Sequence, residues 1–217
     1  MSKSDTQAVK AASGSTAATP MLRTAKVVCQ SGEYVCLIRD LSLQGVSLSF
    51  LHASPEQPRV ILVLANGQTY PIQRVWRGKT RAGYCFASPV PLDEFRHEAQ
   101  PFAVRPIRLS IEASARVIDG RKSYSAHLLD ISIHGARIAC EADMSAGRLV
   151  SLQVSGMAQQ LCTIIWSDAG LEPAHFGLQF QHPLGLKELA HAALKLQPFH
   201  PSGADNNPFQ SDKTRAA

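Results

Sequence analysis

Residues 130–136 read DISIHGA, and two arginines, Arg105 and Arg108, stand before the first predicted strand of the same segment. Guanidinium groups bind phosphate, pair with O6 and N7 of guanine and stack on purine faces. The turn adds a carboxylate for guanine N–H donors, a hydroxyl and a backbone that a ligand can approach closely, from Asp130, Ser132 and Gly135. These residue types are the parts of a binding site for a guanine nucleotide.

The turn also has a purely structural interpretation. Asp and Ser side chains accept hydrogen bonds from nearby backbone amides, and Gly supplies positive φ where a chain reverses. His134, inside the turn, can stack on a guanine or hydrogen-bond to it, or it is only an exposed turn residue. The motif alone does not decide between a ligand site and a strand connection.

A similar turn sequence occurs ninety positions earlier, where residues 40–46 read DLSLQGV. The same shift of ninety aligns further pairs without a gap: Ala25 with Ala115, Tyr34 with Tyr124, Leu62 with Leu152 and Trp76 with Trp166. After the tryptophans the second copy gains four residues, and the match resumes with Phe86 on Phe180. A repeat of this length is a small domain rather than a solenoid unit, so we predict two copies of one domain.

Each copy contains six short segments typical of strands, with turn residues between them, which favours an antiparallel barrel or sandwich. The predicted strands are 25–30, 33–42, 45–51, two within 58–76 and 83–89, then 113–119, 123–132, 135–140, 149–156, 159–166 and 175–182. The aligned Trp76 and Trp166 are predicted to share a role in the two cores.

A helix is predicted after each set of strands, over 92–99 and 184–196. The second has a mostly one-sided apolar stripe, formed by Leu184, Leu186, Leu189, Ala193, Leu194 and Leu196. This stripe either plugs the helix's own barrel or binds a partner or a second copy.

The composition bounds the function. A hydrophobic content of 45% supports buried cores, and a net charge of +5 tolerates an anionic partner without requiring one. Five cysteines without close pairing indicate reduced, mostly buried thiols, and neither zinc spacing nor a metal cluster is present. With no signal peptide, no membrane-spanning stretch and polar tails at 1–20 and 198–217 predicted to be disordered, we expect a cytoplasmic protein.

Residues 21–197 resemble two tandem copies of the PilZ domain. The segments LLDISIHGARI and HFGLQFQHP are similar to that family's second motif and last strand. The resemblance implies a mainly β fold of two six-stranded antiparallel barrels, each followed by a short helix, with domains at 21–99 and 100–197. It also implies a bacterial receptor for cyclic di-GMP, with no cofactor, whose ligand is held by Arg105, Arg108, Asp130, Ser132 and Gly135. His134 is a further candidate for ligand binding, because it lies inside the turn.

The arginine motif departs from the family pattern. That pattern is usually R-x-x-x-R, whereas this chain has Arg105-Pro-Ile-Arg108, one residue short, with Val104 where the first arginine would fall. The first copy keeps the turn, as Asp40, Ser42 and Gly45, but has Ser15 and Ala18 where the arginines would align. We therefore expect the first domain to be a degenerate copy that binds no nucleotide alone.

Three functions remain open. The main hypothesis is a receptor in which ligand binding at the second domain changes the angle between the domains and creates a protein-interaction surface. The partner would belong to motility, pilus, polysaccharide or cell-cycle machinery.

The alternative is an adaptor that has lost the ligand, and the discriminating feature is whether Arg108 reaches the DISIHG turn. Nucleic-acid binding through a basic hairpin (Arg74, Arg77, Lys79 and Arg81) is less favoured, and without a G-x-S-x-G elbow, phosphate loop or metal cluster we expect no enzyme.

Overall fold

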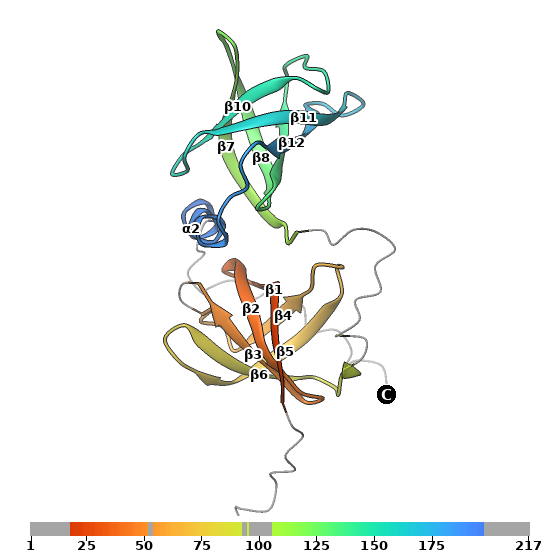
Figure 1. The fold of residues 1–217 in the computed structure, drawn as a ribbon, viewed down its shortest axis with the longest axis vertical. Coiled ribbons are helices and arrows are strands. Elements are labelled where there is room, and N and C mark those ends of the chain that lie inside the picture. Colours follow the sequence, from red (N-terminus) through yellow and green to blue (C-terminus); the bar gives the residue numbers. More distant parts are fainter. Residues whose placement is uncertain (1–17, 52–53, 93–94, 96–105, 198–217) are drawn as a thin grey trace, which may run out of the picture.

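The computed structural model describes residues 18–51, 54–92, 95 and 106–197. They form two closed antiparallel barrels of six strands each. Figure 1 shows the two barrels one above the other along the long axis, with a helix, α2, between them. The predicted fold class of two six-stranded barrels is confirmed, and the predicted tails lie outside the described residues, apart from Ala18–Pro20 at the start of the first barrel.

The first barrel has the strand order β1-β2-β3-β6-β5-β4, and β4 pairs with β1 to close it. Its strands are β1 (Thr19–Cys29), β2 (Gly32–Leu41), β3 (Gly45–Phe50), β4 (Arg59–Val63), β5 (Thr69–Arg77) and β6 (Arg81–Phe86). β1 begins six residues earlier than the sequence predicted, because a register shift between Pro20 and Arg23 lets the strand continue past an irregularity.

The second barrel repeats this order as β7-β8-β9-β12-β11-β10, and β10 pairs with β7. Its strands are β7 (Leu109–Asp119), β8 (Lys122–Ile131), β9 (Gly135–Cys140), β10 (Leu149–Val154), β11 (Gln160–Asp168) and β12 (Ala174–Phe180). The internal sequence repeat therefore corresponds to a repeat of the whole barrel topology.

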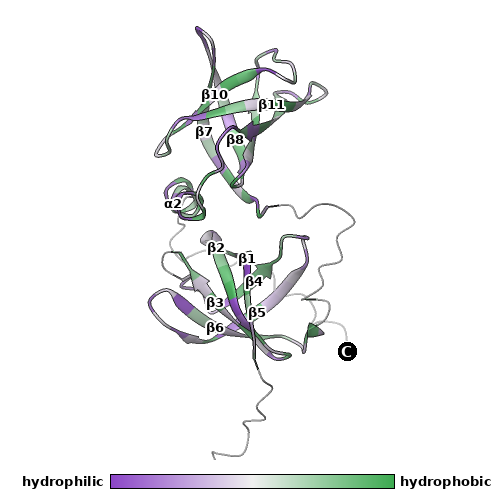
Figure 2. Cartoon of the chain, in the orientation of Figure 1, coloured by the Kyte–Doolittle hydropathy of each residue, from purple (hydrophilic) through white to green (hydrophobic). Residues whose placement is uncertain are grey.

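Alternating burial along the strands builds the two cores. In β3, Val46, Leu48 and Phe50 point into the first barrel, and the residues between them point outward. Figure 2 shows the corresponding mixture of hydrophobic and hydrophilic residues along single strands of both barrels. Burying one face of each strand removes apolar area from water, which is the main force that closes the barrels.

The two tryptophans do not lie in the cores, so this prediction was wrong. Trp76 and Trp166 are 48% and 41% exposed, and each indole covers a glycine of the neighbouring strand, Gly83 or Gly177. Register shifts just before Trp76 and Trp166 turn consecutive residues outward and move the ring onto the outer surface. A sequence shift of ninety can show that the positions are equivalent, but not which side of the strand they face.

Helix α2 (Leu186–Leu196) packs against its own barrel and also contacts β2 of the first barrel. Leu189, Ala190 and Ala193 belong to the core cluster of the second barrel, so of the two roles expected for the apolar stripe the structure shows packing on the helix's own barrel. Val35 of β2 joins this same cluster, while its neighbour Cys36 lies in the core of the first barrel. At Val35 and Cys36, the two faces of β2 thus contribute to different cores.

The helix predicted at 92–99 falls largely outside the described residues. Leu92 and Phe95 are described and have helical backbone conformation. Phe95 is fully buried and stacks near Tyr70 and Phe86 at ring-centroid distances of 5.0 and 6.1 Å. This segment therefore contributes an aromatic side chain to the core of the first barrel.

All five cysteines are free thiols, and Cys36, Cys140 and Cys162 are buried. Burial raises the pKa of Cys162 to about 11 and raises that of Cys36 further still. Only the thiolate reacts with alkylating reagents, and Cys85 is only partly buried, so iodoacetamide at about pH 8 should modify Cys85 well before the buried Cys36 and Cys162. Mass spectrometry of timed samples measures this order, and equal labelling rates in the folded protein would contradict it.

Candidate functional site

The site is organised around a carboxylate, that of Asp130, near the end of β8. Arg108 Nη1 donates to Asp130 Oδ1 at 2.9 Å, and Arg137 Nε lies 2.8 Å from Oδ2. The carboxylate is only 11% exposed, whereas the arginine side chains are 56% and 44% exposed. A mostly buried anion therefore orients two accessible cations, and each carboxylate oxygen has its own guanidinium.

Strand pairing brings these three residues together. Asp130 lies on β8 between β7 and β9, directly opposite Arg137 on β9 and opposite Ser110 on β7. Arg108 stands two residues before Ser110, so it reaches the carboxylate diagonally. A register shift just before Asp130 turns this side chain toward both arginines.

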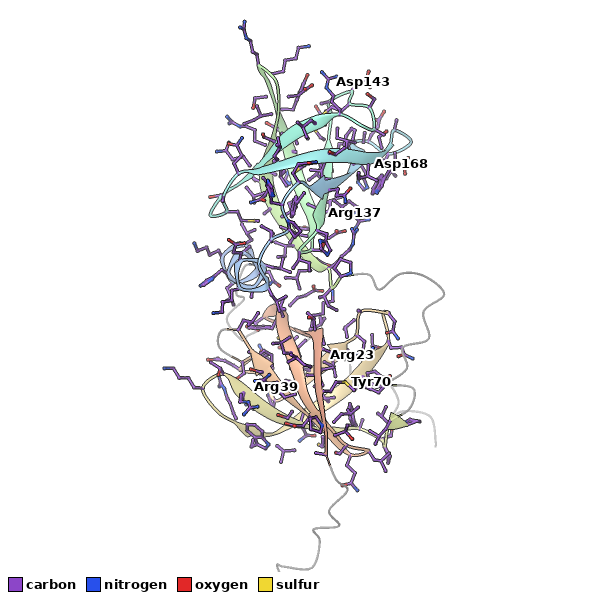
Figure 3. All side chains as sticks on the ribbon, in the orientation of Figure 1. Arg23, Arg39, Tyr70, Arg137, Asp143 and Asp168 are labelled. Carbon is purple, nitrogen blue, oxygen red and sulfur yellow. The ribbon has the colours of Figure 1, made fainter. Side chains whose placement is uncertain are left out.

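Arg137 was missed by the sequence analysis, although the sequence contains a signal for it. The residue follows the motif glycine by two positions, where the first copy has Ser47. A charge present in one copy and absent from the other is a sequence signal that the two copies differ in chemistry at this position. Figure 3 labels Arg137 on the second barrel.

The turn after Asp130 is held by its own serine and glycine. The Ser132 amide donates to the Gly135 carbonyl at 2.8 Å, its hydroxyl lies 3.2 Å from the same oxygen, and the His134 amide donates to that hydroxyl at 3.3 Å. Ser132 is 1% exposed. Ser132 thus shapes the turn from inside, while His134 is exposed on its outer side.

Gly135 is required by space rather than by backbone conformation. A Cβ at this position would overlap the backbone carbonyl of Leu178 on β12. Gly45 in the first barrel stands in the same relation to the Tyr84 carbonyl. The glycine of the motif therefore allows two backbones to approach closely in both barrels.

A cavity of about 350 Å³ lies between the barrels beside the turn. Ile133 and His134 line it from the turn, and Leu186 and Leu189 line it from α2. The remaining lining comes from β1, the β4–β5 loop and the start of the second barrel: Leu22, Arg23, Thr24, Ala65, Pro106 and Ile107. The structure therefore places His134 at the junction of the two barrels, while Arg105 lies outside the described residues.

The first barrel repeats the turn without its cations. Ser42 makes the same contacts to Gly45, with its amide 2.9 Å from the glycine carbonyl. Asp40 again stands opposite β3, but the partner there is Ser47 rather than an arginine, and Ala18 occupies the place of Arg108. A surface groove of about 300 Å³ remains at this position, lined by Ala18, Asp40 and Ser47 among others.

Residues 102–194 match the family model of the PilZ domain. The match covers all six strands of the second barrel, including its DISIHG turn. A comparison with the curated proteins finds no match.

The structure is also similar to solved structures at low sequence identity. PlzA of Borreliella burgdorferi, in complex with c-di-GMP, is 14% identical over 78% of this chain and 86% of that one, with a TM-score of 0.33. The Bacillus subtilis inhibitor of motility MotI (DgrA) is 10% identical over 82% and 95%, with a TM-score of 0.36. Escherichia coli YcgR, in complex with c-di-GMP, is 10% identical over 80% and 81%, with a TM-score of 0.31.

Among the residues that the structure describes, no helix is long and apolar enough to cross a membrane. In the same part of the chain, no group of three or more His, Cys, Asp or Glu side chains could hold a metal ion.

Replacing the motif glycine tests the close approach of the two backbones. Gly135→Ala should destabilise the second barrel by about 1–3 kcal/mol, the usual cost of forcing extra atoms into a packed site. Gly78→Ala is the matched control, because its Cβ would lie 3.4 Å from the nearest atom, the Arg81 carbonyl oxygen, in ordinary contact. Urea unfolding measures both, and equal stability of the two variants would contradict the argument.

Proposed function

We propose that this protein is a cyclic di-GMP receptor whose ligand binds at the DISIHG turn of the second barrel. The observation that carries the proposal is the pair of exposed guanidinium groups held on the buried Asp130 carboxylate, at 2.9 and 2.8 Å. The match of residues 102–194 to the PilZ family supports it, and so do the c-di-GMP complexes of PlzA and YcgR.

The chemistry of the site fits this ligand. A cyclic dinucleotide carries two phosphodiester anions and two guanine bases, and guanidinium groups recognise both phosphates and the O6/N7 edge of guanine. Arg108 and Arg137 each keep N–H donors that Asp130 does not use, because a guanidinium has five. Asp130 then acts by orienting the arginines, and Ser132 and Gly135 act by shaping the turn.

Two further residues complete the proposed site. His134 is exposed on the turn and lines the cavity between the barrels, where a guanine base could stack on it. Arg105 is proposed, from the sequence motif alone, as a third cation that binds the ligand, and it lies outside the described residues. The first barrel is proposed not to bind the ligand alone, because Ala18 and Ser47 replace the two arginines.

The output of the receptor is proposed to be a change in the arrangement of the barrels that exposes a surface for a protein partner. The support is the position of the site, since Arg108 and His134 lie where the two barrels meet. A ligand shifts such an equilibrium only if it binds one arrangement more tightly than the other. Small-angle scattering with and without saturating ligand tests this step, and unchanged profiles would contradict it.

Calorimetric titration with cyclic di-GMP tests the receptor function. We expect saturable binding, weakened about 10- to 100-fold in Arg108→Ala and in Arg137→Ala, because a charge-assisted hydrogen bond contributes about 1.5–3 kcal/mol. Asp130→Ala should weaken binding as well, since both guanidinium groups lose their orienting partner. The affinity should also fall as salt is added, since exposed charges are screened.

Arg148→Ala is the matched control for these variants. Arg148 forms an ion pair of 2.8 Å with Asp119, and their side chains are 51% and 11% exposed, much as in the candidate site. This variant should bind cyclic di-GMP as the unchanged protein does. No heat from folded protein at high ligand concentration would sink the receptor proposal and favour an adaptor that acts only through protein contacts.

A further inference from the structure

The β1–β2 hairpin of the first barrel contains an ion pair that faces the second barrel. Lys26 Nζ lies 2.9 and 2.8 Å from the two oxygens of the Glu33 carboxylate. The side chains are 15% and 13% exposed, so this pair is largely withdrawn from water. An ion pair that is so well shielded from water needs further hydrogen bonds to offset the loss of hydration.

Those further bonds are made to the backbone at the start of β7. Lys26 Nζ donates to the carbonyl oxygen of Arg108 at 2.8 Å, and the Ser110 amide donates to Glu33 Oε2 at 2.9 Å. The two contacts lie on either side of Leu109, which is fully buried in the second barrel. The β1–β2 hairpin of the first barrel thus binds the backbone on both sides of Leu109, including that of Arg108.

The hairpin is itself anchored to the second barrel. Gln197, at the end of α2, donates from its side-chain amide to the Glu33 carbonyl at 2.9 Å and accepts from the Glu33 amide. Val35 inserts into the core cluster of the second barrel beside this contact. The backbone of Glu33 is therefore bound by Gln197, while its carboxylate accepts a hydrogen bond from the Ser110 amide on β7.

We propose that Lys26 and Glu33 are positioning residues for the ligand site of the second barrel. They fix the backbone of Arg108 so that its guanidinium lies on Asp130 before any ligand arrives. The first barrel has Ala18 and Ser47 at the positions of Arg108 and Arg137. Its Lys26 and Glu33 instead hold the backbone of Arg108 in the second barrel.

The expected effect follows from preorganisation. Apparent affinity falls by the fraction of molecules in which the site is competent, so freeing the Arg108 backbone weakens binding without removing a ligand contact. We expect Lys26→Met and Glu33→Gln to weaken cyclic di-GMP binding by about 5- to 30-fold. This expectation rests on the proposed receptor function.

An exchange variant separates positioning from simple stability of the hairpin. In Lys26→Glu/Glu33→Lys the ion pair can re-form within the first barrel. The carboxylate then faces the Arg108 carbonyl, and the ammonium faces the Ser110 amide, so acceptor meets acceptor and donor meets donor. If the pair only stabilises the hairpin, the exchange restores affinity, and if it positions Arg108, affinity stays low. Restored binding in the exchange variant overturns the proposal.

A second readout needs no ligand. The NMR signals of the Arg108 guanidinium report whether it is held on Asp130, and those of Arg148 on Asp119 serve as the internal control. Lys26→Met and Glu33→Gln should move the Arg108 signals toward those of a free arginine and leave the Arg148 signals unchanged.

The two readouts distinguish failure of this proposal from failure of the receptor function. If the unchanged protein binds cyclic di-GMP and both variants bind equally well, the positioning role is wrong. If the unchanged protein binds no ligand, the receptor function fails, and the Arg108 signals alone decide. Unaltered Arg108 signals in both variants then overturn the positioning role, while altered ones support it.

Discussion

The candidate site depends on the need to compensate one mostly buried carboxylate. Asp130 sits at the end of β8 with a side chain that is 11% exposed, and a carboxylate in that position is stable only when cations and donors surround it. The neighbouring strands meet this need with one arginine each, Arg108 before β7 and Arg137 on β9. Because the arginines remain exposed, the interaction that satisfies the anion also presents two oriented cations to solvent.

The two barrels show which parts of the motif are structural. Both have the serine-to-glycine contacts of the turn and the glycine under a backbone carbonyl. Among the residues that the structure describes, only the second barrel pairs its aspartate with arginines, and only residues 102–194 match the PilZ model. The turn thus forms a strand connection in both copies, and the arginines are what distinguish the second copy as a candidate binding site.

Much of the fold could be predicted from the sequence, because the repeat, the alternating strands and the turn residues are local signals. The motif also raised the question of whether Arg108 reaches the DISIHG turn, and the structure answers it with the hydrogen bond from Arg108 to Asp130. Arg137 was missed, because its pairing with Asp130 depends on strand register. The tryptophans were misplaced, because a bulge reverses the side that a residue faces. The Lys26–Glu33 contact to β7 could not be predicted, since nothing in a single sequence shows how two barrels meet.

The most direct test of the central claim is an NMR titration of the full chain with cyclic di-GMP, since the first barrel is a control within the same molecule. The account predicts saturable shifts of the Ser132, His134 and Gly135 amides and of the Arg108 and Arg137 guanidinium signals. The NMR signals of the equivalent Ser42 and Gly45 amides should not shift. Shifts at the first turn instead of the second, or none at either turn at high ligand concentration, would contradict it.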